Sequence, residues 1–209
     1  MIVLLHPPFF RYAGSHNDRI PIELAYASEY LADFQIEHVI VNADYVGSSS
    51  YVPWSHLLHN FEGFMDGVDG RSPLYSEVLE KVMQYHPKLV VVAAGDALMP
   101  DVDVGHYQIA GNFSAMFRRL GVKTMGVGKF VVARPDLFAR DYDATVTGPC
   151  MYGFPDAVTK TLQGKLDRHF TQLSGQMKCL PRYDDLVPAG QDDNYIFSSF
   201  GCPYQCLTE

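Results

Sequence analysis

Residues 87–95 read Pro-Lys-Leu-Val-Val-Val-Ala-Ala-Gly, and this stretch decides the fold class of the chain. Residues 89–93 are continuously apolar, three of them are valine, and the run is bounded by Pro87 and Gly95. A strand without polar alternation is typical of burial on both faces, as in a parallel sheet that helices cover on both sides. We therefore predict a central strand of an α/β domain at 89–93.

Strand-like and helix-like segments alternate on either side of this stretch. Further apolar runs bounded by Gly, Pro or Asn predict strands at 2–5, 39–41, 123–127 and 144–147. Apolar residues at helical spacing predict helices at 21–31, 74–85, 109–120 and 155–166, with a short helical turn at 135–139. Residues 45–74 show no clean period, and we expect them to be irregular. Because parallel neighbours need helical crossovers, the alternation predicts a doubly wound, Rossmann-like parallel sheet of about five strands.

Composition excludes several functional classes. The 209-residue chain carries 24 acidic and 16 basic residues, a formal net charge of −8, and its basic residues do not cluster. Nucleic acid is therefore not expected as a direct partner. No run approaches the roughly 20 apolar residues that cross a bilayer, and no basic segment precedes the apolar start as in a secretory signal. We expect a cytoplasmic protein without membrane contact.

The alternating pattern stops near residue 170. Residues 171–194 are polar and turn-rich, and residues 195–199 (Tyr-Ile-Phe-Ser-Ser) restart a strand. The expected organisation is one α/β domain at 1–170, a linker at 171–194, and the incomplete beginning of a second domain at 195–209.

The loops after the predicted strands are candidates for ligand binding. In open parallel sheets, ligands bind outside the carboxyl ends of the strands, and several loops here are rich in Gly and small residues. Neither G-x-G-x-x-G after the first strand nor a phosphate-binding G-x-x-x-x-G-K-[ST] is present, which argues against nucleotide binding. A simpler interpretation, in which these glycines only form turns, stays open.

Two cysteines, Cys202 and Cys206, follow the terminal predicted strand in Gly201-Cys202-Pro203-Tyr204-Gln205-Cys206. Cysteine thiolates ligate zinc and iron–sulfur clusters, so the pair can contribute to one metal centre. Three residues separate the two thiols, which excludes a redox C-x-x-C motif.

Several segments, in order along nearly the whole chain, resemble cobalamin-dependent radical SAM proteins. They are Leu4-Leu5-His6-Pro7-Pro8, Arg19 to Leu31, Lys88 to Ala93, Gly126 to Pro135, Val146-Thr147-Gly148, Leu180 to Leu186, and Ser199 to Cys206. The resemblance implies an N-terminal cobalamin-binding domain followed by the cluster loop of a radical SAM barrel.

The resemblance also implies cofactors and site residues. Cobalamin would lie against the carboxyl ends of the strands, contacted through backbone or small residues at Pro8, Gly95, Gly126, Gly128, Lys129 and Gly148. In an intact longer form, Cys202 and Cys206 would ligate a 4Fe–4S cluster that binds S-adenosylmethionine. The activity implied is a methyltransferase type, acting on a small-molecule or peptide substrate held by the missing barrel.

The sequence departs from the family pattern in the cluster loop and after the fifth predicted strand, where family members often carry acidic residues but Gly148-Pro149-Cys150-Met151 stands here. The cluster loop C-x-x-x-C-x-x-C would place a third cysteine at position 209, where Glu209 stands. Catalysis by these 209 residues alone is therefore not expected, and no catalytic residue is assigned. The motif D-x-H-x-x-G, which supplies a cobalt-ligating histidine in other cobalamin proteins, is absent, so we expect a histidine-free mode. His6 and His16 are the nearest alternative ligands.

Two alternatives remain. The first is a non-catalytic, flavodoxin-like binding or interaction domain whose terminal cysteines bind zinc between two chains. The second is a degenerate relative that binds nothing.

Overall fold

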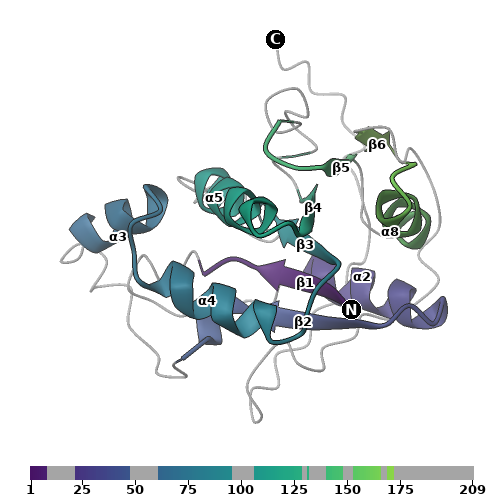
Figure 1. Cartoon of the computed structure of the whole chain (residues 1–209), viewed down its shortest axis with the longest axis horizontal. Helices are drawn as coiled ribbons and strands as arrows, with labels where there is room; N and C mark the ends of the chain where they lie inside the picture. The colour runs from purple at the N-terminus through teal and green to yellow at the C-terminus, as the bar shows by residue number, and fades with distance from the viewer. Residues whose placement is uncertain are drawn as a thin grey trace, which may run out of the picture.

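The computed structural model describes residues 1–8, 22–47, 61–95, 106–128, 131, 140–147, 153–165 and 169–171. Within them, one parallel sheet has the strand order β2-β1-β3-β4-β5-β6 (Figure 1). The strands are β1 (Ile2–His6), β2 (His38–Asn42), β3 (Leu89–Ala93), β4 (Lys123–Val127), β5 (Ala144–Thr147) and β6 (His169–Thr171). The Rossmann-like parallel sheet and the five predicted strands are confirmed. The short edge strand β6 was not predicted.

Helices cover both faces of the sheet (Figure 1). One face packs against α4 (Leu74–Met83) and α5 (His106–Arg119), and the other packs against α2 (Ile22–Asp33) and α8 (Phe154–Leu162). Successive residues of β3 point to opposite faces, so Val90 and Val92 join the first core while Val91 joins the second. All five residues of β3 are buried, as the uninterrupted apolar run predicts.

Helix α5 shows how apolar spacing forms these layers. Ile109, Phe113 and Phe117 lie on one stripe of the helix and are fully buried. The Phe113 ring packs against Tyr75 of α4 with centroids 4.5 Å apart. Gly121, with φ of 77°, ends this helix, and its N–H bonds the carbonyl of Arg118.

The prediction that 45–74 is irregular is wrong over its second half. Residues 61–68 form helix α3 (Phe61–Val68), which carries two glycines and therefore has a weak intrinsic helical signal. Tertiary contacts hold its end: the Tyr75 hydroxyl donates to the carbonyl of Gly67 at 2.8 Å, and Asn112 Nδ2 donates to the carbonyl of Val68 at 2.9 Å. A 3-10 turn, η1 (Ala43–Tyr45), also follows β2 directly.

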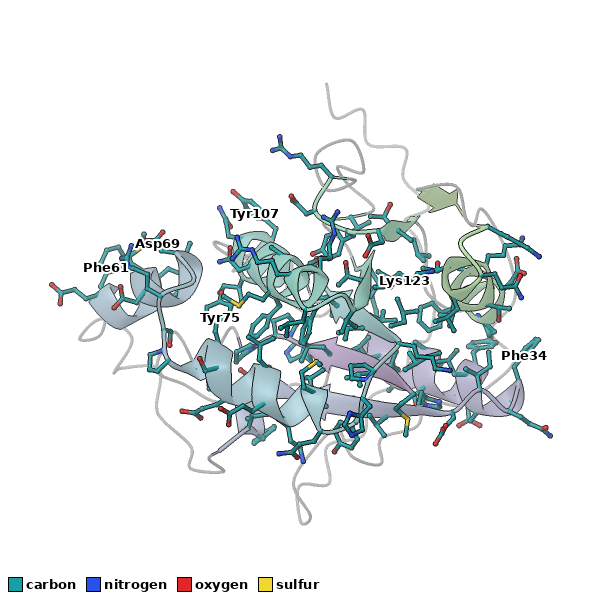
Figure 2. The ribbon with its side chains drawn as sticks, in the orientation of Figure 1. Phe34, Phe61, Asp69, Tyr75, Tyr107 and Lys123 are labelled. Carbon is teal, nitrogen blue, oxygen red and sulfur yellow. The ribbon has the colours of Figure 1, made fainter. Side chains whose placement is uncertain are left out.

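Polar contacts join β4 to its neighbours at the amino end of the strand. The Asp143 carboxylate accepts from the backbone N–H of Thr124 at 2.8 Å and lies 3.4 Å from Nε of Arg118 on α5. Lys123 Nζ donates to the carbonyls of Thr161 and Leu162 at the end of α8, and Figure 2 shows this side chain between β4 and α8. These contacts place the segment 140–143, and with it Tyr142, beside β4.

Candidate ligand site at the carboxyl edge of the sheet

The strand order creates a switch point beside β1. The chain passes from β1 to β2 on one side and then crosses to β3 on the other, so the connections after β1 and β3 diverge. In open parallel sheets the crevice at such a point is where ligands bind. The described residues that border it are His6 at the end of β1 with Pro7 and Pro8 after it, Ala94 and Gly95 after β3, and Gly128 after β4.

Gly95 and Gly128 form a bare stretch of backbone at this edge. The backbone N–H of Ala94 donates to the carbonyl of Val127 at 2.7 Å, which extends the β3–β4 pairing by one bond. Gly95 and Gly128 then turn with φ of 93° and 105°, a conformation that residues with side chains rarely adopt. A Cβ at Gly128 would lie 2.8 Å from the carbonyl oxygen of Ala94 and 3.0 Å from that of Gly95. Only glycine fits here, because the backbone after β3 occupies the place of a side chain.

Gly126 has a different role in the same strand. A Cβ on this residue would lie 2.8 Å from Cδ2 of Tyr142, so the space that a side chain would fill holds the Tyr142 ring. Tyr142 is buried within the core that α4 and α5 cover. The structure therefore gives Gly126 a packing role that the sequence did not indicate. Contact between Gly126 and a ligand stays a prediction.

A buried histidine–carboxylate pair lies at the ends of β1 and β2. His6 Nε2 is 3.6 Å from Oδ2 of Asp44, and each side chain is only 1% exposed. The pairing of His6 with Asn42 in the sheet register brings the two strand ends together, and Asn42 Oδ1 accepts from the backbone N–H of Asp44 at 3.2 Å. Buried polar groups are costly unless they have partners, so this contact fixes the start of η1 against β1. His6 was a candidate from the sequence, but its pairing with Asp44 could not be predicted from sequence alone.

Two buried polar atoms near the β4–α5 seam lack hydrogen-bond partners within the described part of the chain. They are the hydroxyl of Tyr142 and Oε1 of Gln108. Burial, followed by the nearby Asp141 carboxylate, raises the pKa of Tyr142 far above its ordinary value, so the phenol stays protonated and can donate. Neither residue was predicted from the sequence, because an isolated Tyr or Gln carries no motif.

The structure describes some of the predicted site residues and not others. Pro8, Gly95, Gly126 and Gly128 lie at or next to the carboxyl edge of the sheet, and Pro8 is buried. Lys129, Gly148, Cys202, Cys206 and His16 lie outside the described residues, as do the other two cysteines and the predicted helical turn at 135–139. In the described ranges, no group of three or more His, Cys, Asp or Glu side chains could hold a metal ion. No helix in those ranges has the length and apolar character needed to cross a bilayer.

Comparison with known proteins adds no relative: no family, no curated protein and no solved structure matches this chain.

Proposed function

We propose that the α/β domain binds cobalamin at the carboxyl edge of its sheet. The observation that carries the proposal is the pair of positive-φ glycines, Gly95 and Gly128, at the carboxyl edge beside the switch point between β1 and β3. A corrin ring is broad and flat, and backbone can approach such a ligand only where side chains are missing. The order of the sequence segments that resemble cobalamin-dependent radical SAM proteins supports the same function.

The turn after β1 favours a corrin over a nucleotide. Phosphate groups in parallel α/β domains are held by backbone N–H groups in the loop that follows the first strand. Here that turn continues as Pro7-Pro8, and proline has no backbone N–H to donate. Pro7 and Pro8 therefore leave the first two positions after β1 without the backbone N–H donors that a phosphate there would use, whereas the corrin ring itself carries no phosphate.

The wider role that we propose is that of a cobalamin-dependent radical SAM enzyme of methyltransferase type. Bound cobalamin would supply a transferable methyl group, and residues at the sheet edge would hold and orient the corrin. Cys202 and Cys206 would be two thiolates of a 4Fe–4S cluster in the intact enzyme, next to a barrel that holds the substrate. The support for this part is the motif order in the sequence.

The first experiment is cobalamin retention. The purified chain is incubated with hydroxocobalamin and desalted, and its visible spectrum and cobalt content are measured. We expect close to one cobalamin per chain. After reduction to the Co(II) state, the electron paramagnetic resonance spectrum should lack nitrogen splitting, because no histidine or nucleotide base ligates cobalt in the proposed mode.

Two controls separate this function from its alternatives. FMN and ATP, treated in the same way, should not be retained. A colourless protein after desalting would contradict the cobalamin proposal. Zinc at one ion per two chains, together with a dimeric mass, would instead favour the interaction domain with a shared cysteine site.

A further inference from the structure

We infer that Tyr142 and Gln108 form a receptor for one primary amide on the rim of the corrin, with the Tyr142 hydroxyl as donor and Gln108 Oε1 as acceptor. This inference rests on the proposed function and assigns a specific contact within it. Neither residue belongs to the glycines and proline selected from the sequence.

The first observation is the unpaired hydroxyl of Tyr142. The side chain is 1% exposed, and its hydroxyl has no hydrogen-bond partner within the described part of the chain. Most buried polar groups are satisfied, and an exception calls for a water or a ligand as partner. Tyr75 provides the contrast in the same core, because it is 2% exposed and its hydroxyl donates to the carbonyl of Gly67. Figure 2 shows Tyr75 between α4 and α5.

The position of Tyr142 relates it to the ligand edge. Its ring lies on Gly126, the next-to-last residue of β4, which is two residues before Gly128. Val131, which follows β4, is buried in the same core as Tyr142. The phenol is therefore close to the end of β4, where the bare backbone begins.

The second observation is Oε1 of Gln108 on the facing helix. Gln108 lies in the first turn of α5, and this end of the helix is at the carboxyl edge of the sheet because α5 runs back along β3. Gly111, one turn further on, faces the segment that carries Tyr142, since a Cβ there would lie 3.8 Å from Oδ2 of Asp141. Residues three apart share a helix face, so Gln108 and Gly111 flank the same segment. Oε1 is buried and has no partner among the described residues.

A primary amide matches this pair of atoms. Its carbonyl oxygen accepts one hydrogen bond and its NH₂ group donates two, whereas the neutral phenol donates and Gln108 Oε1 only accepts. An ester has the same carbonyl but no N–H, and a carboxylate would leave Oε1 facing another acceptor. The rim of cobalamin carries several primary amides. Neither protein atom is accessible to solvent here, so the bound amide would be shielded from water, where hydrogen bonds are stronger. The edge must open to admit it, and association should be slower than for an open surface site.

The test compares one chemical change at two buried tyrosines. Tyr142→Phe should leave the thermal midpoint of the ligand-free protein unchanged or raise it, because the hydroxyl removed is unpaired. It should weaken hydroxocobalamin binding about fivefold or more, which corresponds to a typical net hydrogen bond. Tyr75→Phe removes a paired hydroxyl, so it should lower the midpoint and leave the affinity unchanged.

A comparison of two corrins, one with amides and one with esters on its rim, tests Gln108 Oε1 as the acceptor. Gln108→Met should weaken binding of aquocobinamide, whose corrin rim carries amides. It should not affect the heptamethyl ester of cobyrinic acid, whose rim carries only esters. Wild-type affinity in either variant, or a lower ligand-free midpoint for Tyr142→Phe, would overturn the inference while leaving cobalamin binding intact. A wild-type protein that retains no cobalamin would overturn both.

Discussion

The aromatic ring of Tyr142 takes the place of a side chain at Gly126, with Cδ2 2.8 Å from the position that a Cβ would occupy. Gly126 pairs with Val92 of β3 and Thr145 of β5. The ring therefore packs on an inner strand of the sheet, close to the carboxyl end of that strand. A glycine that looked like a ligand contact thus supports a buried phenol. Changes at Gly126 will therefore act on Tyr142 before they act on any ligand.

Gly126→Ala should destabilise the protein by overpacking. The new methyl group would meet the Tyr142 ring, and insertion of extra carbon into a packed core typically costs about 1–3 kcal/mol. Urea denaturation measures the loss. In a Tyr142→Ala background the same change should cost much less, because the ring is gone. Equal costs in both backgrounds would show that the two residues are not coupled.

Gly128→Ala should be more costly than Gly121→Ala. Both glycines have positive φ, so alanine is strained at either one by roughly 1 kcal/mol or more. At Gly121 nothing lies within 4 Å of the new Cβ, whereas at Gly128 the Cβ would meet two backbone carbonyl oxygens that cannot easily move. Chemical denaturation measures the unfolding free energy of both variants. The difference between their losses is the cost of the contact with the two carbonyl oxygens, because both variants share the φ strain. Similar losses would argue against a tight β3–β4 edge.

Asp44→Ala should cost far more stability than Asp66→Ala. Removal of one partner from a buried polar contact typically costs about 1–3 kcal/mol because the remaining group is left unsatisfied, and both His6 and Asp44 are 1% exposed. The contact between Asp66 and Arg71 is equally simple to delete, but it lies on the surface, with the side chains 49% and 63% exposed. Screening by water makes such surface pairs weak. Thermal unfolding of the two variants at neutral pH provides the comparison, and equal losses would contradict a stabilising role for the buried pair.

Stability should fall at alkaline pH partly because of Tyr142. Burial raises the pKa of this phenol in the folded protein, while in the unfolded chain it ionises near 10. Above that pH the unfolded state loses a proton that the folded state keeps, so the unfolding free energy decreases by up to about 1.4 kcal/mol per pH unit. Below pH 10 the contribution of this group is constant.

The control for this pH dependence is Tyr142→Phe. Urea midpoints at pH 8, 10 and 11 should decline less steeply in this variant than in the wild type, because the other tyrosines titrate alike in both. Parallel declines would mean that Tyr142 ionises in the folded protein as it does in the unfolded chain.

The sequence by itself determined the class of the fold. Residues 89–93 have no polar position, and such a strand is typical of a parallel sheet that helices cover on both faces. Gly121 and Pro87 mark element ends through their own backbone preferences, so these boundaries could be read locally. Because the strands are parallel, their carboxyl ends lie on the same edge of the sheet.

Only the tertiary structure decided how distant residues meet. The order β2-β1-β3 brings Asp44 to His6, and the β4–β5 pairing brings Tyr142 to Gly126. Helix α3 exists despite its two glycines because Tyr75 and Asn112 bond its last carbonyls. Local patterns report propensity and burial, which depend on near neighbours in the chain. Strand order and strand register depend on how whole elements pack, and for that reason the buried pair and the unpaired phenol could not be found from the sequence.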